Sequence, residues 1–169
     1  MTDNFEPRGE FAPVESFDAS APESIAPNGF IKLGLAPELV RAVEDLGFTQ
    51  PTAVQERTIP LALPAGDQAA GYVDLMVSSQ TGSGKTAAFL LPVLHTLIGQ
   101  SATASKPHPA RAKTRKFQPA APGALVLCPT RELAQQVAHD AIDLVRHCRG
   151  LRIANVVGGM PYQMQIARL

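Results

Sequence analysis

The chain has 169 residues, 45% of them apolar, and its 15 basic side chains balance its 15 acidic ones. This composition is ordinary for one globular domain. The sequence has no apolar run of membrane-spanning length and no signal peptide, which favours a cytoplasmic protein. Two cysteines, Cys128 and Cys148, exclude a disulfide framework or a cysteine zinc site, so both are expected to be packed thiols.

Charge is unevenly distributed along the chain. Residues 1–29 hold six acidic side chains against one basic one, Arg8, together with four prolines. We interpret them as a disordered leader, with the ordered part beginning near Phe30. Residues 99–122 hold five basic side chains and no acidic one. This flexible insertion is either a solvated loop or an auxiliary contact to nucleic acid.

The first helical patterns follow the leader. Proline in the first turn and glycine just after the last turn predict a helix over residues 37–46. Thr52 can cap a second helix, which runs through Gln55 toward Ile59 and is limited by Pro60 and Pro64.

Two longer helices and the start of a third are expected later in the chain. One covers residues 85–98 and ends at Gly99, and Pro92 either kinks it or is accommodated by a local distortion. Another covers residues 131–147, and Pro161 starts the last one. The apolar face of the 131–147 helix is predicted to consist of Leu133, Val137, Ile142 and Val145.

Short apolar runs without polar alternation separate these helices. They lie at residues 73–78, 124–128 and 152–157, and each is typical of a strand buried on both faces. Strands that alternate with helices predict parallel strands covered by helices, which is an α/β fold.

A glycine-rich turn joins the first of these strands to a helix. It reads S-Q-T-G-S-G-K-T, from Ser79 to Thr86. Such a turn directs backbone N–H groups at an anion, Lys85 can reach the outer phosphates, and the Thr86 hydroxyl suits Mg²⁺. The usual pattern begins with Gly where this chain has Ser79, but the context predicts binding of a nucleoside triphosphate.

Three further segments accompany this loop in a fixed order. They are G-F-T-Q-P-T-A-V-Q at residues 47–55, P-T-R-E-L-A-Q-Q at residues 129–136, and Gly158-Gly159. Together the four resemble motifs of DEAD-box ATP-dependent RNA helicases of the bacterial type. That family writes the loop A-x-T-G-x-G-K-T, so Ser79 is one small residue in place of another. The resemblance covers the chain from about Phe30 onward.

The resemblance implies a role for each motif. Adenine would be read at one edge by an amide and covered by an aromatic ring, which selects ATP over GTP; the residues are Phe30, Phe48, Thr52 and Gln55. ATP phosphates and Mg²⁺ would be held by Ser79, Gln80, Thr81, Gly82, Ser83, Gly84, Lys85 and Thr86, with the metal at Thr86. RNA phosphates would be contacted without sequence preference by Pro129, Thr130, Arg131, Gly158 and Gly159.

The resemblance also implies that the 169 residues hold only part of the family's helicase core. The family's D-E-A-D and S-A-T motifs and its second domain have no counterpart in the 169 residues. Residues 30–169 are therefore expected to form part of a RecA-like P-loop NTPase domain with a parallel sheet, without its catalytic acids. Unpaired sheet edges would make this chain marginally stable and prone to aggregation.

The predicted function is ATP-dependent RNA unwinding or remodelling, of which the chain keeps the nucleotide contacts and part of the RNA surface. Two alternatives stay open. One is another P-loop enzyme, such as a small-molecule kinase, and the other is a non-enzymatic module that binds nucleotide or RNA. None of the four histidines is assigned chemistry.

Overall fold

A computed structural model describes residues 28–63, 73–104 and 122–166. Residues 1–27 of the expected leader and most of the basic insertion, residues 105–121, lie outside the described residues. A 3₁₀ helix and five α-helices follow in the order η1 (Gly29–Leu33), α1 (Pro37–Asp45), α2 (Ala53–Ala62), α3 (Lys85–Ala104), α4 (Arg131–Leu144) and α5 (Tyr162–Ile166).

The first two α-helices begin where their capping residues predict. Pro37 occupies the first turn of α1. The Thr52 hydroxyl accepts the Gln55 N–H while the Gln55 side chain accepts the Thr52 N–H, which makes a reciprocal capping box at the start of α2. Pro60 lies inside α2 and does not limit it, because the helix continues to Ala62. The limit predicted at Pro60 is therefore wrong, while the helix does end before Pro64.

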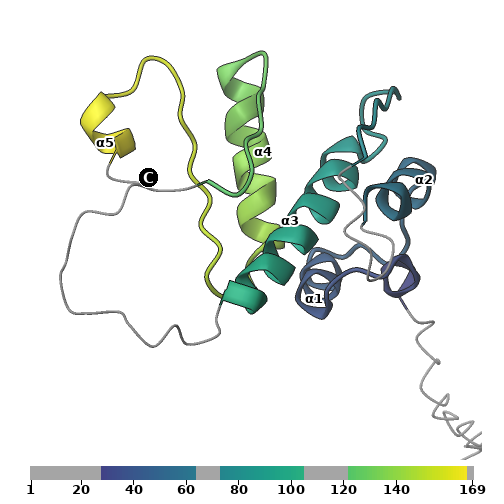
Figure 1. Ribbon diagram of the computed structural model, residues 1–169. Coiled ribbons are helices and arrows are strands. Elements are labelled where there is room, and N and C mark those ends of the chain that lie inside the picture. Colours follow the sequence, from purple (N-terminus) through teal and green to yellow (C-terminus); the bar gives the residue numbers. More distant parts are fainter. Residues whose placement is uncertain (1–27, 64–72, 105–121, 167–169) are drawn as a thin grey trace, which may run out of the picture.

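Helix α3 is the central element and packs against α2 and α4, while α1 packs against α4 and η1 (Figure 1). It runs through Gly99 to Ala104, so the predicted stop at Gly99 is wrong. A glycine inside a helix costs only about 1 kcal/mol relative to alanine. Pro92 is accommodated within the helix, and its carbonyl accepts a hydrogen bond from the Thr96 hydroxyl at 3.0 Å.

The core lies where η1, α1 and α2 meet α3. Its largest fully buried side chains are Phe30, Leu39, Val43, Ile59 and Leu91. His95 of α3 reaches across this boundary, and its Nδ1 accepts the backbone N–H of Ala36 at 3.0 Å. Since that N–H precedes the first turn of α1, a tertiary contact supplies a partner that no local side chain provides.

Helix α4 packs on this core with a different face from the predicted one. Its buried residues are Val137, Ala141 and Leu144, whereas Leu133 and Ile142 are 37% and 52% exposed. The helix ends at Leu144, and residues 145–147 form a turn. The half-buried thiols of Cys128 and Cys148 pack against the core as free cysteines. Burial, and secondly the Glu38 carboxylate, raise the pKa of the Cys148 thiol.

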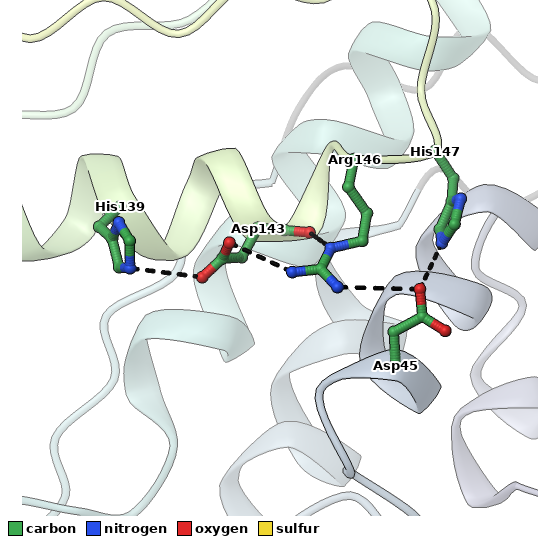
Figure 2. A network of polar contacts seen from close by, with 5 residues as sticks. All are labelled: Asp45, His139, Asp143, Arg146 and His147. Carbon is green, nitrogen blue, oxygen red and sulfur yellow. Dashed lines mark hydrogen bonds and ion pairs between the residues drawn. The ribbon is translucent and has the colours of Figure 1, made fainter.

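A chain of polar contacts joins α1 to the end of α4, as Figure 2 shows. His147 Nε2 lies 2.6 Å from Asp45 Oδ2, and Arg146 lies 3.8 Å from the same carboxylate oxygen. Arg146 also contacts Asp143 at 3.3 Å, and Asp143 contacts His139 at 3.6 Å. Partly exposed pairs of this kind contribute only about 0–1 kcal/mol each. The network therefore orients the two helix ends more than it stabilises them.

The three expected strands are absent from the part of the chain that the structure describes, where every regular element is helical (Figure 1). Residues 73–80, 124–128 and 151–157 belong to neither helix nor strand. Their apolar side chains, predicted to be buried on both faces, include Val73 at 65% exposure, Met76 fully exposed and Leu127 at 84%. A strand is held by hydrogen bonds to neighbouring strands, so apolar composition alone does not form one.

Among the described residues, no helix is long and apolar enough to cross a membrane.

Candidate functional site

The glycine-rich loop forms a turn immediately before α3, and Lys85 is the first residue of that helix. Gly82 and Gly84 have φ angles of +77° and +85°, which residues other than glycine rarely adopt. The Lys85 ammonium donates to the carbonyl oxygens of Ser79, at 2.6 Å, and of Gln80. The Ser79 and Ser83 hydroxyls are hydrogen-bonded to each other across the loop. The Lys85 ammonium is thus held by backbone carbonyls at the start of the loop.

The start of α2 is bound directly to this loop. Gln55 Nε2 donates to the Gly84 carbonyl at 3.1 Å, and the Thr52 hydroxyl donates to the Ser83 carbonyl at 2.8 Å. Gln55 is 6% exposed. The Gln55 Oε1 accepts one hydrogen bond, from the Thr52 N–H, and Nε2 donates one, to the Gly84 carbonyl. One acceptor position and one donor hydrogen of the amide are left for a ligand. Two motifs 29 residues apart in sequence therefore form one unit.

The two aromatic candidates have different environments. Phe30 is 1% exposed and belongs to the core, while Phe48 is 49% exposed. Asn28 ties the two segments together, because its Oδ1 accepts the Phe30 N–H and its Nδ2 donates to the Phe48 carbonyl, both at 2.9 Å. Asn28 belongs to none of the sequence motifs. Its position as the N-cap of η1 is the signal that could have identified it.

A second group lies at the start of α4. The Thr130 hydroxyl caps the helix by accepting the Leu133 N–H at 3.3 Å. Arg131 Nη1 donates to the Gly158 carbonyl at 3.0 Å. Gly159 has a φ angle of +78°, and a Cβ placed on it would lie 2.6 Å from the same Arg131 nitrogen. The structure thus brings Arg131 and the two glycines together, next to Pro129 in sequence.

Gln165 is a further residue of this group that the sequence did not reveal. It is 8% exposed, and its amide is hydrogen-bonded to backbone groups on both sides of the two glycines. An isolated glutamine on a short helix has no sequence signal that separates it from an exposed one.

A cavity of about 680 Å³ opens between α2, α3, α4 and the extended segments. Lys85 and Thr86 reach its edge, but most of its wall is apolar and includes Val77, Phe89 and Val126. Gln55 and Phe48 do not line it. In the described part of the chain, no group of three His, Cys, Asp or Glu side chains could hold a metal ion.

Comparison with known proteins identifies the family of this chain. Residues 52–169, more than half of the chain, match the family described as DEAD/DEAH box helicase. The chain is 41% identical over 134 residues to the ATP-dependent RNA helicase SrmB of Haemophilus influenzae, which covers 79% of this chain and 26% of that protein. It is 40% identical over 136 residues to the ATP-dependent RNA helicase RhlB of Xanthomonas oryzae pv. oryzae, covering 80% and 20%.

Solved structures agree with the sequence relatives. The helicase Prp28 of Chaetomium thermophilum bound to ADP matches with a TM-score of 0.56 at 34% identity, covering 79% of this chain and 28% of that one. Dbp5 of S. cerevisiae bound to RNA and ADP BeF3 matches with a TM-score of 0.52 at 32% identity, covering 72% and 25%. The chain thus spans about a quarter or less of the curated relatives described here. It belongs to the DEAD-box family of RNA helicases and carries an amino-terminal part of that family's RecA-like helicase domain.

Proposed function

We propose that this chain supplies the ATP-binding part and some of the RNA-binding surface of a cytoplasmic ATP-dependent RNA helicase that unwinds or remodels RNA. The observation that carries the proposal is the pair of hydrogen bonds from Thr52 and Gln55 to Ser83 and Gly84. These bonds attach the Gln55 amide, which can recognise a base, to the glycine-rich loop, which can bind phosphates. A nucleotide that lies along the loop then meets both groups at once.

The chain's residues would hold ATP in distinct ways. Gln55 offers its remaining donor and acceptor to one adenine edge. Phe48, which is 49% exposed, is the aromatic candidate for the adenine face, because Phe30 is 1% exposed within the core. Residues 79–84 surround the phosphates, Lys85 exchanges its bonds to loop carbonyls for bonds to phosphate oxygens, and the Thr86 hydroxyl completes the magnesium shell. Bound Mg²⁺ would neutralise charge on the outer phosphates.

RNA would be held through its backbone. Arg131, the α4 N-terminus capped by Thr130, and the bare backbone of Gly158 and Gly159 together offer donors to phosphate oxygens. Such contacts position a strand without reading its sequence, which suits an enzyme that acts on many RNA segments. The complete parallel sheet, the catalytic acids and the second domain belong, in this proposal, to the family sequence beyond the quarter that the chain spans.

Nucleotide selectivity tests the proposal. Affinities for ATP and GTP are compared in the 169-residue chain and in Gln55→Ala, with Gln136→Ala as the control because Gln136 is an exposed glutamine on α4. A bidentate amide–adenine contact discriminates by about 1–3 kcal/mol. The ATP preference should therefore fall roughly fivefold or more in Gln55→Ala and stay unchanged in the control.

The ratio of ATP affinity to GTP affinity is informative, because a general loosening of the loop would weaken the binding of both nucleotides alike. Equal affinity of the unmodified chain for ATP and GTP would contradict the proposal and favour another P-loop enzyme, such as a small-molecule kinase. ATP selectivity without any RNA binding would favour a nucleotide-binding module.

A further inference from the structure

The Gln165 side chain on α5 is a buried polar group that makes three hydrogen bonds to backbone. Its Oε1 accepts the Val157 N–H at 2.9 Å. Its Nε2 donates to the Val157 carbonyl at 3.0 Å and to the Met160 carbonyl at 3.1 Å. Both amide hydrogens are thus used, and the side chain is 8% exposed. A glutamine so fully engaged fixes the backbone that it contacts.

These three bonds enclose the two glycines. Val157 precedes Gly158 and Met160 follows Gly159, so Gln165 anchors the turn at both ends. The exchange of two bonds with Val157 repeats the pattern of a hydrogen-bonded pair in an antiparallel sheet, with a side-chain amide in place of one backbone. The positive φ of Gly159 is thereby held within a closed unit.

The turn that Gln165 anchors is also the hydrogen-bond partner of Arg131. The guanidinium donates to the Gly158 carbonyl at 3.0 Å, and the direction of that carbonyl is set by the turn. Helix α5 lies to one side of α1 to α4, at the end of the extended segment that follows α4 (Figure 1). Few packing contacts are therefore available to orient the turn, and the Gln165 amide does so instead.

We propose that Gln165 is a positioning residue for the RNA-contacting group formed by Arg131, Gly158 and Gly159. The inference rests on the proposed function, because it assigns that group to RNA. Gln165 does not touch RNA; it fixes the backbone against which the Arg131 guanidinium is aligned. Removal of its amide should reduce RNA affinity while leaving the ATP site, on a different element, unaffected.

The substitution that isolates the amide is Gln165→Met, which keeps an unbranched side chain for packing but loses the three hydrogen bonds. Gln163→Met is the matched control, because Gln163 is an exposed glutamine on the same helix. Binding of a short fluorescent oligouridylate by the 169-residue chain is followed by anisotropy, and ATP binding is measured in parallel. Loss of buried hydrogen bonds of this kind should weaken RNA binding roughly fivefold or more. ATP affinity and the control should not change.

Hydrogen exchange measured by mass spectrometry provides an independent readout of the turn itself. The Val157 amide should exchange faster in Gln165→Met and at the original rate in Gln163→Met. RNA binding and exchange that both match the unmodified chain would overturn the positioning role while leaving the proposed function intact. Failure of the unmodified chain to bind RNA would overturn the RNA surface of the proposed function, and this inference with it. A parallel loss of ATP and RNA affinity would also overturn the inference, because it would indicate general unfolding.

Discussion

Replacement of Gly84 by alanine should be more harmful than the same change at Gly82, although both glycines lie in one loop with nearly equal positive φ angles. A Cβ on Gly84 would lie 2.4 Å from Gln55 Nε2 and 3.1 Å from the Thr52 hydroxyl. A Cβ on Gly82 meets nothing within 4 Å. The pair therefore separates the cost of backbone conformation from the cost of the contact with α2.

The expected magnitudes follow from these two terms. A non-glycine residue in the left-handed region costs about 1–2 kcal/mol, and both substitutions include this term. Gln55 is held at both ends of its amide and is 6% exposed, so it cannot move aside freely. Displacement would leave buried polar groups unpaired, at about 1–3 kcal/mol. We expect Gly84→Ala to lower the free energy of unfolding by about 2–5 kcal/mol, against about 1–2 kcal/mol for Gly82→Ala.

Urea unfolding, followed by the helical circular dichroism signal, measures both values in the 169-residue chain. A third comparison tests the assigned cause. In a Gln55→Ala background the 2.4 Å contact is removed and the 3.1 Å contact with the Thr52 hydroxyl remains, so Gly84→Ala should then cost only slightly more than Gly82→Ala. Equal costs of the two glycine substitutions in the unmodified background would refute the reasoning, since they would show that Gln55 does not press on Gly84.

Two further predictions concern the core and the extended segments. Phe30→Ala should lower the free energy of unfolding by about 3–5 kcal/mol because the ring is 1% exposed, and Phe48→Ala should cost clearly less because that ring is 49% exposed; similar losses in urea unfolding would contradict the assignment of Phe30 to the core. Met76→Lys combined with Leu127→Lys should reduce self-association of the chain in sedimentation velocity, because both side chains are exposed on unpaired segments; unchanged association would show that these segments are not its cause.

The helices were predictable to the extent that their signals are local. Thr52 and Gln55 form the capping box, and Pro37 begins α1, because each cap needs only residues within one turn. The predicted end at Gly99 failed because a single glycine costs less than the helix gains by continuing. Of the apolar face predicted for residues 131–147, Val137 is buried and Val145 packs against the core, whereas Leu133 and Ile142 are exposed. Which residues are covered depends on α1 and α3 and not on helical period alone.

The strands could not be judged from composition in the same way. Residues 73–78 and 124–128 have the apolar character of buried strands, yet Met76 and Leu127 are exposed. A parallel strand forms no hydrogen bonds with its own sequence neighbours, so its existence depends on segments elsewhere. The motifs were predictable because residue types at fixed spacings in the sequence define them. Gln165 and Asn28 were not, because they bind backbone groups that only the folded structure brings within reach.

The two proposed ligand sites share one chemical feature. Lys85 donates to the carbonyls of Ser79 and Gln80, and Arg131 donates to the carbonyl of Gly158. A neutral carbonyl is a weaker partner for a cation than an anionic phosphate oxygen, because only the phosphate adds the Coulomb attraction between opposite net charges. Each cation is therefore kept in place by a partner that a phosphate can displace. In both cases a second side chain, Gln55 or Gln165, holds the backbone of the same motif, so displacement can occur without the loop losing its shape.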